Sequence, residues 1–242
     1  MRYQASADCL KDKIILVTGA GDGIGKAAAL AYAQHGATVV LLGRTVHKLE
    51  KVYDEIQNNG YPDAAIYPLN LEGATPKDYE ELANTLKGNF GRLDGLLHNA
   101  AFLGANTPLQ HYDIELWFKV MQVNLNAPFV MTQALLPLMM DTPDSSIVFT
   151  IDDRSNAYWG AYGISKSALQ TFMTILADEM DTDKPVRVNA VLPEPVRTGM
   201  RMKAYPGEDP NTLRTPDTIM ETYLYLMSND CNETGQTFKT LE

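Results

Sequence analysis

Cysteine is scarce in this 242-residue chain, and its scarcity argues against two kinds of site. Cys9 and Cys231 lie far apart in the sequence, with no C-x-x-C pair and no companion histidines. A disulfide framework needs several cysteines, and a structural zinc site needs clustered cysteine and histidine ligands. We therefore expect two reduced thiols and no metal site.

Positive charge is also in short supply. The chain has 20 lysines and arginines against 30 aspartates and glutamates, which gives a formal net charge of -10 and a pI near 4.9. A surface of this sign repels phosphate backbones and anionic lipids, and no basic patch of useful size stands out. The composition therefore argues against nucleic acid and against a membrane surface as partners.

Long apolar runs are missing as well. Met1–Leu10 contains no run long enough for a signal peptide, and the apolar stretch Ala127–Met140 is interrupted by Thr132, Gln133 and Pro137. A membrane-spanning helix needs about 20 consecutive apolar residues. We therefore expect a cytoplasmic protein.

Short apolar runs that alternate with helical patterns occupy the whole chain. Hydrophobic residues make up 45% of it and charged residues 21%, the proportions of an ordinary globular protein. The alternation predicts the α/β class, a doubly wound parallel sheet, Rossmann-like, with helices on both faces. No linker or change of composition interrupts the series, so residues 1–242 are predicted to form a single domain.

Apolar periodicity gives the expected element boundaries. The expected strands cover residues 14–17, 38–42, 65–68, 95–98, 146–150, 186–192 and the vicinity of 237–238. The expected helices cover residues 26–35, 46–58, 77–90, about 113–140, 162 to about 181, and a last one ending at 227. Residues 193–216 are expected to be irregular and to act as a lid over the site.

A glycine-rich turn, T-G-A-G-D-G-I-G at residues 18–25, directly follows the first expected strand. Between a strand and a helix, such a turn lets backbone amides and the helix N-terminus hold a pyrophosphate. Its spacing is G-x-x-x-G-x-G rather than the commoner G-x-G-x-x-G. The predicted cofactor contacts in this turn are Thr18, Gly19, Asp22, Gly23, Ile24 and Gly25.

Arg44 follows the second expected strand, where dinucleotide-binding folds read the adenosine ribose. An acidic residue there would accept a hydrogen bond from the 2′-hydroxyl of NAD, whereas a guanidinium suits a 2′-phosphate. We therefore predict NADP(H) rather than NAD(H). The alternative is a surface arginine without a ligand.

The segments that follow the other strands are further candidates, because ligands of such sheets bind beyond the carboxyl ends of the strands. Taken singly, the asparagines among them are as typical of turns as of ligand contacts. Together they predict one cleft. The cofactor-binding candidates are Asn70, Leu71, Asn99, Ala100, Ala101, Pro193, Val196 and Thr198.

Tyr162 and Lys166 are four residues apart in an expected helix, which puts both side chains on one face. A tyrosine has an ordinary pKa of about 10, and a nearby cation favours the phenolate. The pair is therefore suited to general acid/base catalysis near neutral pH. A Y-x-x-x-K spacing also arises by chance, so its interpretation depends on the motifs around it.

These motifs, in this order, resemble the short-chain dehydrogenase/reductase family over nearly the whole chain. The resemblance is carried by residues 18–25, by Asn99-Ala100-Ala101 where the family usually has N-A-G, by Asn124 in V-N-L, and by Tyr162-x-x-x-Lys166. The phrases L-H-N-A at 97–100, M-Q-V-N at 121–124 and Y-W-G-A-Y at 158–162 look like its YciK-like bacterial branch.

The resemblance implies roles for several residues. Tyr162 would exchange a proton with the substrate oxygen, and Lys166 would lower the pKa of Tyr162 and hold the nicotinamide ribose. Asn124 would help to fix a proton-relaying water; its alternative is a polar residue that bends the helix. Thr198 would contact the nicotinamide carboxamide. The family's pairing of the helices that carry Asn124 and Tyr162 implies a homodimer or homotetramer.

Two departures from the family pattern affect the expected chemistry. The usual serine beyond the fifth strand is replaced by Asp152, which would oppose a developing oxyanion if ionised but could donate a hydrogen bond if protonated. Ser155, three residues on, is the other candidate for this role. Pro193-Glu194 stands where the family typically has Pro-Gly, which removes a glycine and adds a carboxylate near the nicotinamide position.

The sequence therefore predicts an NADP(H)-dependent oxidoreductase that interconverts a small-molecule carbonyl and a secondary alcohol, with Tyr162 as general acid/base. Its predicted catalytic residues are Tyr162, Lys166, Asn124, Asp152 and Ser155. The alternative, motivated by Asp152 and Glu194, is a non-catalytic NADP(H)-binding sensor or structural subunit.

Overall fold

Seven parallel strands form one sheet in the computed structural model, which describes residues 3–181 and 185–240. The strand order is β3-β2-β1-β4-β5-β6-β7. The strands are β1 (Ile14–Thr18), β2 (Thr38–Gly43), β3 (Ala65–Pro68), β4 (Gly95–His98), β5 (Ser146–Thr150), β6 (Arg187–Leu192) and β7 (Thr237–Lys239). The helices are α1 (Gly23–Gln34), α2 (Val46–Asn58), α3 (Pro76–Phe90), α4 (Ile114–Met121), α5 (Ala127–Met140), α6 (Gly160–Glu179), α7 (Gly199–Ala204) and α8 (Met220–Met227).

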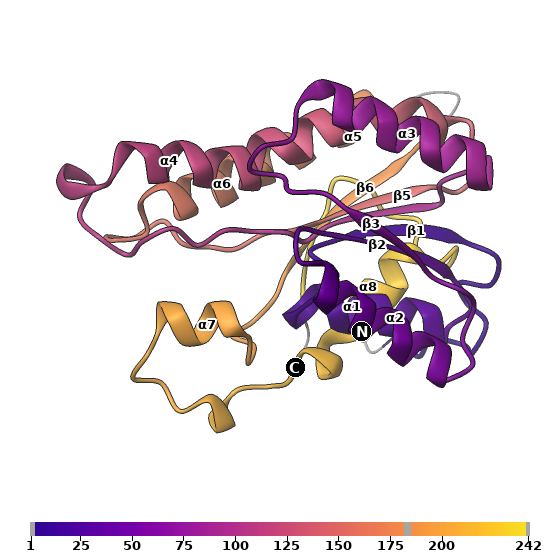
Figure 1. Cartoon of the computed structure of the whole chain (residues 1–242), viewed down its shortest axis with the longest axis horizontal. Coiled ribbons are helices and arrows are strands. Elements are labelled where there is room, and N and C mark those ends of the chain that lie inside the picture. Colours follow the sequence, from indigo (N-terminus) through magenta and orange to yellow (C-terminus); the bar gives the residue numbers. More distant parts are fainter. Residues whose placement is uncertain (1–2, 182–184, 241–242) are drawn as a thin grey trace.

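Helices cover both faces of the sheet (Figure 1). On one face, α1, α2 and α8 pack on the strands through an apolar cluster that includes Val17, Tyr32 and Tyr223. On the other face, α3, α5 and α6 pack through a cluster that includes Leu16 and Leu135. Successive strand residues point to opposite faces, so Leu16 and Val17 enter different clusters. This is why the strands read as continuous apolar runs, and the predicted doubly wound α/β fold is confirmed.

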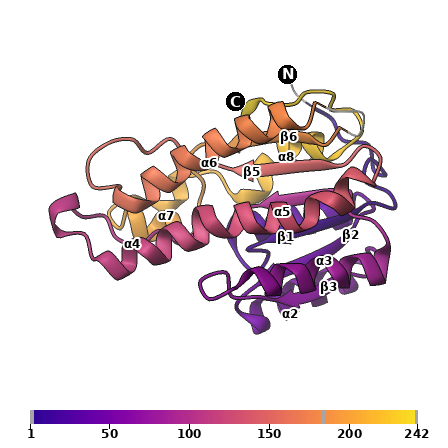
Figure 2. The ribbon, with the colours of Figure 1, turned by 90° about the horizontal axis from the view of Figure 1, so that it is seen from above.

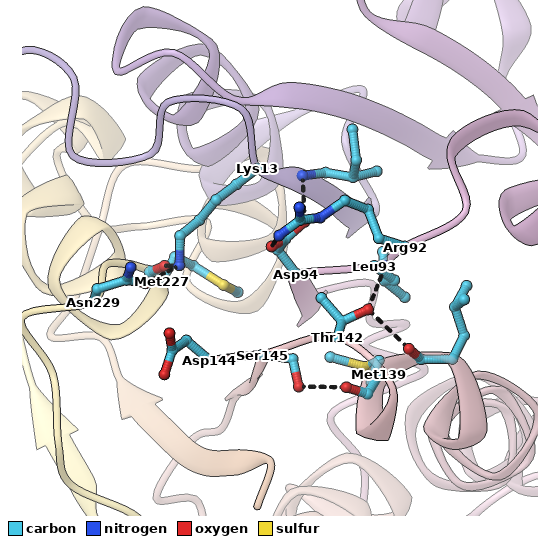
Figure 3. A network of polar contacts seen from close by, with 12 residues as sticks. Lys13, Arg92, Leu93, Asp94, Met139, Thr142, Asp144, Ser145, Met227 and Asn229 are labelled. Carbon is cyan, nitrogen blue, oxygen red and sulfur yellow. Dashed lines mark hydrogen bonds and ion pairs between the residues drawn. The ribbon is translucent and has the colours of Figure 1, made fainter. Parts of the chain in front are cut away.

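The amino ends of the strands are tied together by buried polar groups (Figure 3). The Asp94 carboxylate, just before β4, accepts a hydrogen bond from Ile14 N of β1 at 2.9 Å and pairs with Arg92. Lys13 Nζ donates to Met227 O at 3.0 Å and to Asn229 Oδ1 at 2.6 Å. These groups therefore satisfy one another within the protein, as buried polar groups generally do.

Helix boundaries differ from the sequence prediction in two places that matter for the site. The single helix expected over residues 113–140 is interrupted by a π turn at Gln122–Asn126, which separates α4 from α5. The segment 193–216, expected to be irregular, contains α7, whose first turn is capped by the Thr198 side chain. Local apolar periodicity detects neither feature, because the π turn depends on a partner outside the helix and α7 is only 6 residues long.

The order of the strands positions the site. From β1 the chain proceeds outward to β2 and β3, and then returns to place β4 on the other side of β1. Ligands of doubly wound sheets bind at such a switch point, in the crevice beyond the carboxyl ends of the strands. Among the described residues, no helix is long and apolar enough to cross a membrane.

Candidate active site

A cleft of about 1080 Å³ opens at the carboxyl ends of the strands. The segments that follow the first six strands all contribute to its lining. The predicted site residues that line it are Gly19, Asp22, Gly23, Ile24, Arg44, Asn70, Leu71, Asn99, Ala100, Ala101, Asp152, Tyr162, Lys166, Pro193, Val196 and Thr198. Those that do not line it are Thr18, Gly25, Asn124 and Ser155.

Thr18 and Gly25 act behind the cleft surface. Thr18 Oγ1 accepts hydrogen bonds from Asn99 N at 2.9 Å and Ala100 N at 3.0 Å, and donates to Leu97 O at 3.1 Å. Thr18 therefore fixes the segment after β4 against the end of β1. At Gly25 an added Cβ would collide with the carbonyl oxygen of Gly19, so only glycine lets α1 approach the turn this closely.

The amino end of α1 meets the requirements of a phosphate site. α1 is 12 residues long, so its N-terminus carries the positive end of the helix dipole. A Cβ on Gly23 would already lie 3.3 Å from Thr198 Cγ2, so glycine keeps space open here. Asp22 Oδ1 accepts from Gly23 N at 2.8 Å, which means that the protein's own carboxylate uses part of this positive end.

Lys48 lines the cleft although it is not among the predicted site residues. Its Nζ lies 2.5 Å from Asp22 Oδ2, and this hydrogen-bonded pairing lowers the pKa of Asp22. Lys48 belongs to the first turn of α2, four residues after Arg44, and both side chains line the cleft. Two cations at the carboxyl end of β2 fit a 2′-phosphate better than a bare ribose. The signal in the sequence is the short spacing between the two basic residues.

Asn70 and Leu71 line the cleft beyond β3. Asn70 Oδ1 accepts from Glu72 N at 3.2 Å, a local turn-forming bond. Leu71 is buried in the core on the α3 side of the sheet. Asn70 thus combines the turn function with a position at the cleft.

Asn124 lies in the π turn with its side chain bonded entirely to protein. Its Oδ1 accepts from Phe102 N at 2.7 Å, and its Nδ2 lies 3.0 Å from both Phe102 O and Ser165 Oγ. The interpretation of Asn124 as a helix-bending polar residue therefore fits the structure. It joins the segment after β4 to α6, so it supports the cleft from behind, and its role with a proton-relaying water remains a prediction.

The Tyr162 hydroxyl and the Asp152 carboxylate meet inside the cleft. Tyr162 Oη donates to Asp152 Oδ2 at 3.1 Å. Lys166 Nζ donates to Thr150 O at 2.7 Å and lies 5.9 Å from the centroid of the Tyr162 ring. The Lys166 ammonium is therefore bonded to the end of β5 and not to the Tyr162 hydroxyl, and that hydroxyl is bonded to Asp152.

The expected lowering of the Tyr162 pKa is contradicted in this structure. Burial raises the pKa of Tyr162, and the adjacent Asp152 charge raises it further. Burial also lowers the pKa of Lys166 to about 8. The helical spacing of the two groups suggests only that a cation lies near the phenol. It contains no information on the carboxylate beside the hydroxyl or on the depth at which both groups lie.

The structure separates Asp152 from Ser155. Asp152 lines the cleft at the Tyr162 hydroxyl, whereas Ser155 is exposed and does not line the cleft. This geometry favours Asp152 for the role of the family's serine, and that role remains a prediction. Arg154, which is not among the predicted site residues, approaches Asp152 from the other side, with Nε 3.3 Å from Asp152 Oδ1. Its signal in the sequence is the D-D-R run directly after β5.

The segment after β6 closes over this end of the cleft. Trp159 is buried between Tyr162 and Tyr205, with ring centroids 5.6 and 5.8 Å away. Thr198 Oγ1 accepts from Arg201 N at 3.1 Å, which caps α7.

Glu194 lines the cleft in a backbone conformation that does not require glycine, since its φ is not positive. The carboxylate, and not the loss of glycine, is therefore the consequence of this substitution.

Comparisons with known proteins agree with this geometry. The family model for short chain dehydrogenases matches residues 13–209. The uncharacterized oxidoreductase YciK of Escherichia coli K12 is 46% identical over 98% of this chain and 95% of its own. A short chain dehydrogenase of Salmonella enterica serovar Typhi superposes with a TM-score of 0.96 at 44% identity, covering 99% of this chain and 100% of that chain. A protein of Escherichia coli CFT073 in complex with NADPH superposes with a TM-score of 0.95 at 45% identity, covering 98% and 100%.

Proposed function

Because the chain belongs to the short chain dehydrogenase family of oxidoreductases, in its YciK-like branch, we propose that it uses NADP(H) to interconvert a carbonyl and a secondary alcohol. The observation that carries the proposal is the buried Tyr162 hydroxyl, which lines a cleft of dinucleotide size together with Lys166. The NADPH complex of a 45% identical protein supports the choice of cofactor.

The residues available for NADP(H) divide along the cleft. The glycine turn and the amino end of α1 suit the pyrophosphate, and Arg44 and Lys48 suit the 2′-phosphate. Thr198 lies beside Gly23, and we assign it to the nicotinamide half of the cofactor. When bound, the nicotinamide donates or accepts the hydride, and the protein supplies orientation and the proton.

Tyr162 is the proton donor in carbonyl reduction. Burial and Asp152 both favour the protonated phenol, which is the form that reduction requires. Asp152 Oδ2 accepts this proton's hydrogen bond at 3.1 Å, so a substrate oxygen has to replace the carboxylate as acceptor. The protonated phenol is thus the starting form for carbonyl reduction, and the reverse reaction requires the phenolate as base. A protonated Asp152 would instead donate a hydrogen bond to the substrate oxygen, as the usual serine does.

Cofactor choice is tested by thermal denaturation with NADPH and with NADH. A ligand that binds the native state raises Tm by mass action, so NADPH should raise it more than NADH. Arg44→Gln and Lys48→Gln should each reduce the NADPH shift and leave the NADH shift nearly unchanged. Lys51→Gln, on α2 outside the cleft, is the matched control. Equal shifts with both cofactors in the wild-type protein would contradict the assignment of the 2′-phosphate site.

Catalysis is tested by assaying NADPH oxidation with a panel of ketones and aldehydes. Tyr162→Phe should abolish turnover and keep the NADPH-induced Tm shift. Asp152→Ser should increase turnover of a neutral ketone, because it replaces a charged acceptor by a neutral donor. Absence of turnover in both the wild-type and the Asp152→Ser protein, with NADPH still bound, would favour the non-catalytic sensor or structural subunit.

We further propose a homodimer or homotetramer formed through the layer of α4, α5 and α6, in which α4 and α5 run end to end and α6 lies beside them (Figure 2). These helices carry large apolar side chains that are exposed in the single chain, and such a set is unusual for a monomer. The exposed residues are Ile114, Phe118, Phe129, Ile164 and Ile175. The expected cytoplasmic location remains a prediction.

A further inference from the structure

Arg154 brings a guanidinium into the cleft next to the reacting groups. It belongs to the segment between β5 and α6, lines the cleft, and retains 25% of its side-chain exposure. Its Nε lies 3.3 Å from Asp152 Oδ1, and the other oxygen of the same carboxylate accepts the Tyr162 hydroxyl. One carboxylate thus separates Arg154 from the proposed proton donor.

The guanidinium of Arg154 is poorly satisfied by the protein. Its Nε is buried and makes no hydrogen bond within the described residues, because the N–H is not aimed at Asp152 despite the short separation. Aromatic rings lie near it instead, with Cζ 5.1 Å from the Trp159 ring centroid and 5.9 Å from that of Tyr205, both within cation–π range. A buried donor without an acceptor is costly, so the protein leaves this guanidinium without its full set of acceptors. Because Nε itself is enclosed by protein, an oxyanion in the cleft would meet the part of the side chain that remains exposed.

Arg201 provides an internal comparison on the same side of the cleft. Its Nε and Nη2 each donate to the Glu208 carboxylate at 2.6 Å, and its Cζ lies 3.7 Å from the Tyr205 ring centroid. This arginine has its bidentate partner within the protein and holds α7 to the segment that follows it. Arg154 shares the aromatic environment, but it approaches its carboxylate, Asp152, through one Nε–Oδ1 separation of 3.3 Å and not through two short hydrogen bonds, which leaves it more available to a ligand than Arg201.

The charge of the cleft points the same way. Its lining includes the basic residues Arg44, Lys48, Arg154, Lys166, Arg201 and Lys203, and the acidic residues Asp22, Asp152 and Glu194. The whole chain has a formal net charge of -10, so the excess of cations is local to the cleft. Arg44 and Lys48 are assigned to the cofactor. Arg201 is paired with Glu208, and Lys166 is held by Thr150 O, which leaves Arg154 and Lys203 as the lining cations that can meet a substrate anion.

We propose that the substrate is a carbonyl compound that also carries an oxyanion, a carboxylate or a phosphate, and that Arg154 binds this oxyanion. The inference rests on the proposed function, because it identifies the substrate class of that same site. The link through Asp152 keeps the two groups close, so the oxyanion lies only a few bonds from the carbonyl that receives the Tyr162 proton. The planar guanidinium offers the paired donors that carboxylate and phosphate accept.

The first test compares matched carbonyl compounds with and without the charge. Acetoacetate and levulinate are assayed against their methyl esters, and dihydroxyacetone phosphate against dihydroxyacetone, which separates the carboxylate and phosphate sources. For the preferred anion, Arg154→Gln should raise KM by about 10- to 100-fold, the loss expected for a charged hydrogen bond. Its effect on the neutral partner should stay within about threefold, as should any effect of Arg197→Gln, an exposed arginine outside the cleft.

Arg154→Lys tests whether the substrate anion needs the paired hydrogen bonds of the guanidinium or only a positive charge, because lysine keeps the charge and loses the planar fork. Partial recovery of KM is expected. A neutral ester used as well as its acid by the wild-type protein would overturn the proposal. So would an equal fall of kcat for charged and neutral compounds in Arg154→Gln, since that pattern marks a residue that only positions Asp152.

A binding measurement keeps this test independent of turnover. With NADP⁺ present, 3-hydroxybutyrate and glycerol 3-phosphate are titrated against the wild-type protein and Arg154→Gln, with Tm as the readout. A shift that depends on Arg154, without turnover of any compound, would support the anion site and contradict the proposed reaction. Turnover of neutral compounds with no Arg154-dependent shift would support the reaction and overturn the anion site.

Discussion

At the residue scale, Lys166 is an ionisable side chain that is buried in the protein. Its Nζ donates to Thr150 O, and the opposing charge that acts on it belongs to Asp152. Burial disfavours the charged form and lowers the pKa to about 8. The ammonium is therefore held close to its titration point, where proton loss and gain are both accessible under mild conditions.

This shift predicts how stability depends on pH. An unfolded chain holds a lysine near a pKa of about 10.4. Between pH 8 and that value, the unfolded state binds a proton that the folded state has lost, so stability increases as pH rises. The full gain is about 3 kcal/mol, and it should be absent from Lys166→Met. Urea denaturation from about pH 7 to about pH 10 gives the free energy of unfolding of the wild-type protein and of Lys166→Met. The difference between the two free energies isolates the Lys166 titration, because the titrations of distant groups contribute equally to both. Parallel pH profiles for the two proteins would contradict the shift.

At the element scale, Asp94 joins β1 to β4 at the end of the sheet opposite the cleft. The Asp94 side chain is 2% exposed and accepts bonds from Ile14 N and from Arg92. A buried carboxylate with this many donors is costly to remove, because the donors are left without an acceptor. The network at the amino ends thereby sets the register of β1 and β4, whose opposite ends carry Thr18 and Asn99.

Asp94→Ala should reduce the free energy of unfolding by about 3 kcal/mol. Glu80→Ala, an exposed position on α3, should change it by less than about 0.5 kcal/mol. Urea denaturation at neutral pH measures both. NADPH should still protect Asp94→Ala, because the cleft lies at the other end of the strands. A loss of stability no larger than that of the control would show that solvent or neighbouring groups replace the carboxylate.

The π turn between α4 and α5 illustrates why element boundaries escape local sequence reasoning. An uninterrupted helix over residues 113–140 satisfies the apolar periodicity. The interruption serves Asn124, whose side chain bonds the backbone of Phe102 and the hydroxyl of Ser165. Both partners lie far away in the sequence, so the reason for the turn exists only in three dimensions.

At the scale of the whole molecule, α4, α5 and α6 form the surface through which we propose self-association, and they carry exposed aromatic side chains. Phe118 is 66% exposed and Phe129 is 48% exposed. Phe129 packs at 5.8 Å from Phe172 of α6, so its ring is already oriented by the fold. These rings are therefore the residues to change in a test of the proposed self-association.

Phe118→Asp together with Phe129→Asp should therefore shift the protein from oligomer to monomer, because both changes place charge in an interface that excludes water. Light scattering coupled to size-exclusion chromatography measures the mass. The control pair is Glu50→Ala and Lys51→Ala on α2, which lies on the other side of the sheet. A wild-type protein that is monomeric at high concentration would contradict the proposed self-association.

The sequence by itself determined the doubly wound fold and the position of the cleft. Alternation of apolar strands with helices leaves few arrangements, and parallel strands bring their following segments to one edge. For this reason the positions of Arg44, Asn99 and Tyr162 along the chain are enough to assign them to one cleft, and all three line it. These features depend on patterns that lie close together along the chain.

Only the tertiary structure decided how the groups in the cleft act on one another. It placed the Asp152 carboxylate at the Tyr162 hydroxyl and left Ser155 outside the cleft lining, and it raised rather than lowered the pKa of Tyr162. It also brought Lys48 and Arg154 into the cleft. Each outcome depends on burial and on distances of a few ångströms between residues whose spacing along the chain does not fix them. Charge interactions in a low-dielectric interior are sensitive to both.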